Sequence, residues 1–213
     1  MKKKIFIIGL AMAATFAISP GTQAIVGPGV TKTFTVQATV PAATGADITV
    51  HSVNSVGTPI FTPVTGTSLS FDPMTFNTAN GIYLPNHYFA ISVTPAGGAG
   101  NPNVSVNYTE GSNPNAAASA HGLGWKSTAT FVKVTGPTTE TVLPTHGKKL
   151  LKDIAGENIN APELGGGYLR VYLGIVTGDP NAQPPNPSGN EVFTNTDNPG
   201  AYGGTLTITT TTI

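Results

Sequence analysis

The sequence predicts an all-β protein built as a sandwich of short strands. Eight alternating or β-rich runs are separated by clusters of Gly, Pro and Asn, and the chain has 26 glycines and 18 prolines among 213 residues. Such clusters form turns, and many short strands with turns between them are typical of sandwiches and barrels. There is no cysteine, so stability must come from burial and backbone pairing alone.

The first predicted strand lies in TKTFTVQATV, residues 31–40. Every second residue from Phe34 is apolar, and the residues between them are Thr or Gln. A period of two places the apolar side chains on one face of a strand. These residues are Phe34, Val36, Ala38 and Val40.

Seven further strands follow along the chain. They are DITVHSV (47–53), SLSF (68–71), HYFAISVT (87–94), NVSVNYT (103–109), TATFVKV (128–134), YLRVYLGIV (168–176) and GTLTITTTT (204–212). Only KKLLKDIAGE, residues 148–157, has helical spacing, and we expect a surface turn there at most. The proline-rich residues 177–190 predict an extended loop.

Residues 1–24 have the pattern of a secretory signal, with three lysines, an apolar stretch and small residues before the cleavage site. We expect cleavage between Ala24 and Ile25. A membrane anchor is disfavoured because Gly9, Ser19 and Pro20 interrupt a stretch shorter than the roughly 20 apolar residues that a span needs. No other segment is long or apolar enough to cross a membrane, so the predicted location is outside the cytoplasm without membrane insertion.

Charge argues against nucleic acid as a partner. Without Lys2, Lys3 and Lys4 the mature chain has seven basic and ten acidic residues, a formal net charge of −3. No basic patch is available to neutralise phosphates. Charged residues make up only 9% of the chain, so we expect a surface of Thr, Ser, Asn, Gly and Pro.

The chemistry-bearing residues predict no enzyme, no metal site and no cofactor. The four histidines lack metal-ligand spacing, and no nucleophile motif is present. We expect Asp153, Glu157 and Glu163 to be solvated charges beside a short helix. Trp125 is more typical of a core residue than of an exposed sugar-stacking side chain.

The chain resembles the major pilin subunits of the alternate (alpha-clade) chaperone–usher fimbriae, of the colonisation-factor and cable-pilus type. FTVQATVP, soon after the signal, is similar to the opening of those pilins. The other matching features are SLSFDPMTF (68–76), the pair HYFAISVT and TATFVKV, and the ending AYGGTLTITTTTI. Together they span most of the mature chain.

This resemblance implies an incomplete immunoglobulin-like β-sandwich, completed by a donor strand from a neighbouring subunit. Residues 25–40 would be the donor strand, 41–46 a linker and 47–213 the pilin domain. Phe34, Val36, Ala38 and Val40 would be the inward plugs, and Tyr202, Leu206 and Ile208 would lie on the carboxy-terminal strand that borders the acceptor groove. The implied partners are identical subunits, a periplasmic chaperone, an outer-membrane usher and a possible tip adhesin, and the implied location is a cell-surface fimbrium reached through the periplasm.

A second hypothesis stays open at this point. The opening strand would fold back in cis, with PAATGA (41–46) allowing a reversal onto 47–53. The chain would then be a self-complemented secreted sandwich or a tip adhesin that binds a host-surface receptor.

Overall fold

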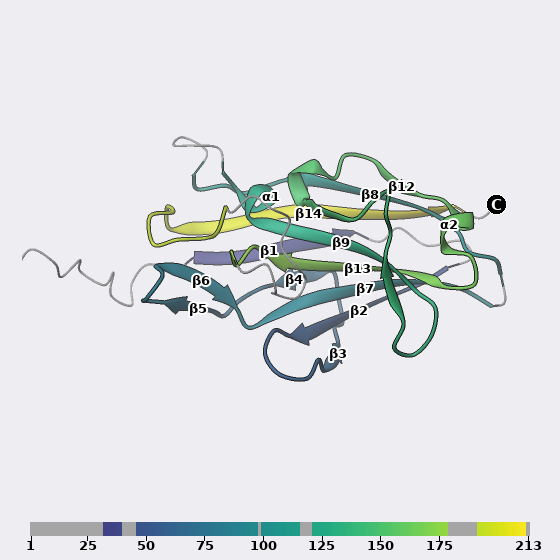
Figure 1. Ribbon diagram of the computed structural model, residues 1–213. Coiled ribbons are helices and arrows are strands. Elements are labelled where there is room, and N and C mark those ends of the chain that lie inside the picture. The colour runs from purple at the N-terminus through teal and green to yellow at the C-terminus, as the bar shows by residue number, and fades with distance from the viewer. Residues whose placement is uncertain (1–31, 40–45, 98, 116–120, 179–190, 212–213) are drawn as a thin grey trace, which may run out of the picture.

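The computed structural model describes residues 32–39, 46–97, 99–115, 121–178 and 191–211. The signal, its cleavage site at Ala24 and Ile25, Val40 and most of the linker lie outside these residues. The fold is all-β, with 54% of the described residues in strands and few helices. Figure 1 shows the strands in two layers.

We call the first layer sheet 1. Its five strands are in the order β12 (Glu157–Ile159), β8 (Asn103–Glu110), β14 (Gly200–Thr211), β1 (Lys32–Thr39) and β4 (Ser68–Ser70). β14 is antiparallel to β8 and parallel to β1, and β1 is antiparallel to β4. The first and the last strands of the described chain are therefore neighbours in the middle of one sheet.

We call the second layer sheet 2. Its strands are in the order β10 (Glu140–Val142), β9 (Ser127–Val134), β13 (Tyr168–Ile175), β7 (His87–Pro95), β2 (Ala46–Asn54) and β3 (Phe61–Pro63), and β11 (Lys148–Leu150) also pairs with β9. A separate hairpin joins β5 (Met74–Asn77) to β6 (Ile82–Pro85). The helices are short: α1 (Leu123–Lys126), the 3₁₀ turn η1 (Leu151–Asp153) and α2 (Ala161–Leu164).

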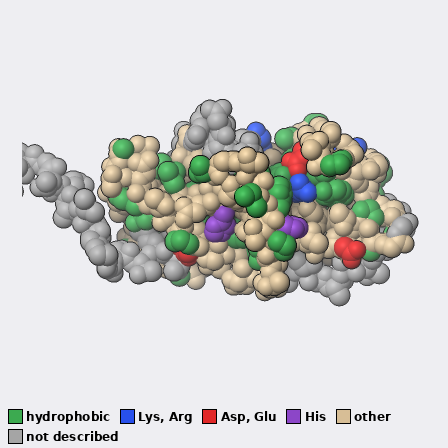
Figure 2. All heavy atoms as spheres, turned by 90° about the horizontal axis from the view of Figure 1, so that it is seen from below, with side chains coloured by type: hydrophobic (Ala, Val, Ile, Leu, Met, Phe, Trp, Pro, Cys, Tyr) green, Lys and Arg blue, Asp and Glu red, His purple; other side chains and the backbone are tan. Residues whose placement is uncertain are grey.

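The core lies between the two sheets. Alternation brings one apolar face of each sheet inward, as the periodicity predicts. Phe89 and Ile91 of β7 and Phe131 of β9 meet Leu206 of β14 in one buried cluster. The face seen in Figure 2 has few charged side chains, which agrees with the low charged fraction.

Two local expectations are wrong. Residues 148–157 do not form a helical turn alone: Lys148–Leu150 are strand β11, η1 follows, and Glu157 begins β12. The other concerns the reversal of the opening strand onto 47–53. β2 occupies that segment and pairs with β7 and β3 in sheet 2, whereas β1 lies in sheet 1.

Candidate functional site: the groove between β14 and β4

The candidate site is the groove between β14 and β4, which β1 fills. We call it the strand groove. β1 has eight residues aligned with β14, from Lys32 opposite Gly200 to Thr39 opposite Thr207. On its other edge it pairs with β4 over three residues. If β1 were removed, β14 and β4 would each lose their strand partner on this side.

β14 forms the longer wall because its sequence alternates over twelve residues. Tyr202, Leu206 and Ile208 are at most 1% exposed and belong to the core cluster. Thr205 and Thr207, which lie between them, are on the opposite face of the sheet, as strand alternation requires. The three residues expected at the acceptor groove thus lie on the strand that borders β1.

Gly204 interrupts this apolar row for a steric reason. A Cβ at this position would lie 2.2 Å from the Tyr108 hydroxyl oxygen and 2.5 Å from the adjoining ring carbon. The Tyr108 ring of β8 therefore lies across the space that a side chain would fill. Gly204 is also the residue opposite Val36 of β1.

β4 forms the shorter wall. Leu69 is fully buried and lies opposite Val36, and the following Phe71 is fully buried as well. On the exposed side, the Gln37 amide Nε2 donates a hydrogen bond to the Ser68 hydroxyl at 3.3 Å. The groove thus offers β1 apolar contacts inside and polar contacts outside.

Val36 is the described anchor of β1, since its side chain is fully buried in the core cluster. The register places Phe34 opposite Tyr202 and Ala38 opposite Leu206. The side chains of Phe34 and Ala38, and all of Val40, lie outside the described residues. Among the described side chains of β1, Val36 thus lies in the core, and the pairing with β14 runs along the full length of β1.

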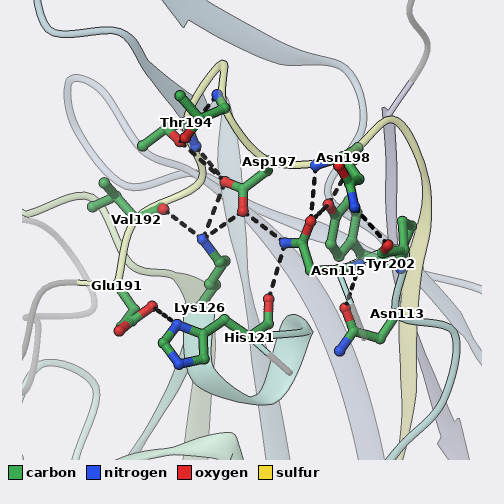
Figure 3. A network of polar contacts seen from close by, with 12 residues as sticks. Asn113, Asn115, His121, Lys126, Glu191, Val192, Thr194, Asp197, Asn198 and Tyr202 are labelled. Atoms are coloured by element: carbon green, nitrogen blue, oxygen red, sulfur yellow. Dashed lines mark hydrogen bonds and ion pairs between the residues drawn. The ribbon is translucent and has the colours of Figure 1, made fainter. Parts of the chain in front are cut away.

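A buried polar network lies near the start of β14 (Figure 3). The Lys126 ammonium lies 2.8 Å from Asp197 Oδ1, and both side chains are less than 10% exposed. Asn115 donates to the same Asp197 oxygen at 2.7 Å and accepts from the Tyr202 hydroxyl at 3.0 Å. The network ties the segment before β14 to α1 and to the end of β8.

Charge pairing sets the protonation of this network. Burial alone raises the pKa of Asp197, but the Lys126 ammonium and the Thr194 backbone N–H outweigh burial and lower it. Burial raises the pKa of the Tyr202 phenol, so Tyr202 stays a hydrogen-bond donor. Asp197 is therefore a carboxylate that is fully engaged by donors.

The prediction of solvated carboxylates is wrong for Glu157. His146 is only 6% exposed and lies between two carboxylates. Its Nδ1 is 2.5 Å from Glu157 Oε1, and its Nε2 is 3.0 Å from Glu163 Oε2. Lys149 also contacts Glu157, whose side chain is 12% exposed. Glu157 is therefore not a solvated charge. Its partners are 8 and 11 residues away, beyond the local spacing that sequence reasoning tests.

Trp125 is neither buried in the core nor open to a ligand. Its ring stacks on His121 at 4.8 Å between centroids, and the Lys152 ammonium lies 4.3 Å from its centroid. Both contacts occupy the ring surface that a bound sugar would need. In the part of the chain that the structure describes, no group of three or more metal-ligating side chains could hold a metal ion.

Comparison with known proteins does not assign this chain to a family, and the search for membrane helices finds none among the described residues. No family model matches the chain, and no curated protein or solved structure matches it either. Across the described residues, no helix combines the length and apolar character needed to cross a bilayer. The class that the fold defines is thus an all-β sandwich whose amino-terminal strand fills a groove beside its last strand.

Proposed function

We propose that this chain is a structural subunit of an adhesive surface fimbria, exported and assembled through the chaperone–usher pathway and polymerised by donor-strand exchange. The observation that carries this proposal is the position of β1. It is the first described strand, and it pairs with β14 over eight residues and with β4 over three. The strand of one copy therefore has the form needed to fill the groove of another.

Strand addition explains why such a contact would be both strong and specific. Main-chain hydrogen bonds supply affinity along both edges of the added strand. Alternating side chains fix its register, because a slip by one residue would turn Val36 from the core to solvent. An unfilled groove would expose two strand edges and core side chains, which favours aggregation and explains the need for a chaperone.

The test is deletion of residues 25–40 behind an intact signal. Cells that express the deleted chain from its own locus should show no fibres by electron microscopy, and the chain should still co-purify with its chaperone. Gln37→Ala is the matched control, since Gln37 is exposed, and it should still form fibres. Fibres from the deleted chain would overturn the proposal.

A self-complemented binding module is the second candidate, and the seating of β1 in its own chain favours it. Such a module would be a stable monomer with one cooperative melting transition and no ladder of oligomers. Its receptor site would be the open groove of about 610 Å³ along β2, whose apolar lining is Ile48, Val50, Pro63 and Val64. A purified mature chain that stays monomeric, and binds cells only while this groove is intact, would support this alternative.

A further inference from the structure

Three buried side chains of complementary reactivity meet beside α1. They are the amine of Lys126, the carboxyl of Asp197 and the carboxamide of Asn115 (Figure 3). Lys126 is 5% exposed, Asn115 is 4% exposed, and the Asp197 side chain is 8% exposed. The arrangement thus places a nucleophile, a proton carrier and an acyl group together away from water.

A single oxygen atom holds the nucleophile and the leaving group together. Asp197 Oδ1 lies 2.8 Å from Lys126 Nζ and accepts a hydrogen bond from Asn115 Nδ2 at 2.7 Å. The amine and the amide are therefore neighbours around one carboxylate. Fixing two reactants next to each other removes much of the entropic cost of their reaction.

Two donors lie at the Asn115 carbonyl. Its Oδ1 accepts from the Asn198 backbone N–H at 2.8 Å and lies 3.0 Å from the Tyr202 hydroxyl, whose single proton is shared with the Asn198 carbonyl at 2.6 Å. Tyr202 is 1% exposed, so its hydroxyl is held in place. Donors aimed at a carbonyl oxygen stabilise the negative charge that develops there when a nucleophile attacks.

One side of the reacting groups is apolar. The ring of Phe193, which is fully buried, has its centroid 5.1 Å from Lys126 Nζ. Proton transfer within the Lys126–Asp197 pair would give a neutral amine and a neutral acid, and an apolar wall lowers the cost of forming that neutral pair. The amine also donates to the Val192 carbonyl at 2.9 Å, and it would release this bond as it turns on its flexible stem toward the amide carbon.

We propose that Lys126 and Asn115 form an intramolecular amide cross-link, with Asp197 as the proton carrier. Asp197 takes a proton from the Lys126 ammonium, and the Nζ lone pair attacks the Asn115 side-chain carbonyl carbon. The carbonyl π electrons move to Oδ1 and are held by Tyr202 and the Asn198 N–H. When they return, the bond to Nδ2 breaks, Asp197 gives its proton to the leaving nitrogen, and one ammonia leaves. Asp197 then takes the second proton from Nζ, so the products are a neutral amide, ammonia and a protonated Asp197. No oxidant or reductant is needed, since one amide replaces another.

The cross-link would connect the end of α1, directly before β9 of sheet 2, to the segment that follows β8 of sheet 1. It would give a cysteine-free chain a covalent tie that reducing agents do not break. It is independent of fibre formation, so its failure would leave the proposed function untouched.

The test is the intact mass of the purified mature chain under denaturing conditions. The expected mass is lower than that of the unmodified chain by one ammonia. Trypsin should cut after Lys133 and not after Lys126, and chymotrypsin cleavage at Trp125 should leave the two fragments joined. A wild-type chain of unmodified mass, cut normally after Lys126, would overturn the proposal.

Variants separate the cross-link from other losses of ammonia. Lys126→Arg keeps the cation but lacks the reacting amine, so its mass should be unmodified. A loss of ammonia that persists in Lys126→Arg would point to cyclisation at an asparagine instead and would contradict the cross-link. Tyr202→Phe should still react, more slowly, because one of the two carbonyl donors is removed.

Discussion

Buried charges in this protein are satisfied by partners that lie far away in the sequence. Lys126 and Asp197 are 71 residues apart, and Tyr202 bonds an asparagine 87 residues away. Removing one partner of such a pair leaves an uncompensated buried charge, which is strongly destabilising. Sequence spacing alone carries no signal for contacts of this kind, so sequence reasoning missed the network.

The same limit applies to His146. A neutral imidazole has one N–H, whereas the doubly protonated ring has two and can donate to both Glu157 and Glu163. Neither carboxylate lies at the i+3 or i+4 position that a helical or metal-site pattern would have indicated. His146 contacts Glu157 of β12 and Glu163 of α2 only because the folded chain brings these elements together.

Acid should destabilise the protein through three carboxylates. The pKa of Glu157 is lowered because the hydrogen bonds from Lys149 and His146 outweigh the effect of burial. The Asn160 backbone N–H is the main cause of the lowered pKa of Glu163. Lys126 lowers the pKa of Asp197. Groups with a lowered folded-state pKa bind fewer protons when folded, so their stabilisation is complete above the ordinary carboxyl pKa and is lost as the pH falls below about 4.5. Urea unfolding at pH values from about 7 to about 3 measures this loss.

Glu157→Gln should flatten the acid dependence, because that position no longer titrates. Asp153→Asn is the control, since the Asp153 side chain is 51% exposed, and it should follow the wild type. Burial raises the pKa of Glu110, which therefore contributes with the opposite sign. A free energy of unfolding that rises steadily from about pH 5 to about pH 3 would show that Glu110 dominates and would contradict the prediction.

Among the elements, long strands were predictable, and most short ones were not, although SLSF does contain β4. HYFAISVT differs from β7 by one residue at its end, because apolar and β-branched residues fill it. β3, β10 and β12 have three residues each, too few to show a period of two. Each exists because a longer neighbouring strand offers an edge.

Residues 148–157 show how tertiary pairing overrides a local pattern. Leu150, Leu151 and Ile154 have helical spacing, yet Leu150 pairs with Thr128 on the edge of β9. Leu151 and Ile154 are buried all the same, in a turn that ends at Gly156 with φ of 65°. The sequence pattern thus correctly predicted that these apolar residues pack on one face, but it did not predict their backbone conformation.

β1 is the element whose contribution is simplest to measure. Val36→Ala removes buried methyl groups opposite Gly204 and Leu69, so the free energy of unfolding of the purified chain should fall by about 2 kcal/mol. Gln37→Ala, one residue along, removes an exposed side chain and should change it by less than about 0.5 kcal/mol. Equal stability of the two variants would show that β1 is not seated in the core of the isolated chain.

For the whole molecule, the question is whether one copy keeps its own β1 or donates it. Residues 40–45 join β1 in sheet 1 to β2 in sheet 2, and β1 has no strand partner in sheet 2. Exchange of such a strand between copies replaces each contact with an identical one, so the two arrangements differ little in contact energy. The kinetic barrier and the local concentration of copies then decide between them.

A disulfide across β1 and β14 separates the two arrangements, because the chain has no cysteine of its own. Gln37 lies opposite Thr205, and neighbouring strands place such pairs within the distance that a disulfide spans. In the purified monomer, Gln37→Cys with Thr205→Cys should oxidise within one chain and run as a monomer on a non-reducing gel. The locked monomer should fail to join fibres, and reduction should restore polymerisation if β1 is exchanged between copies. Gln37→Cys alone is the control for the engineered thiol, and locked chains that still polymerise would exclude donation of β1.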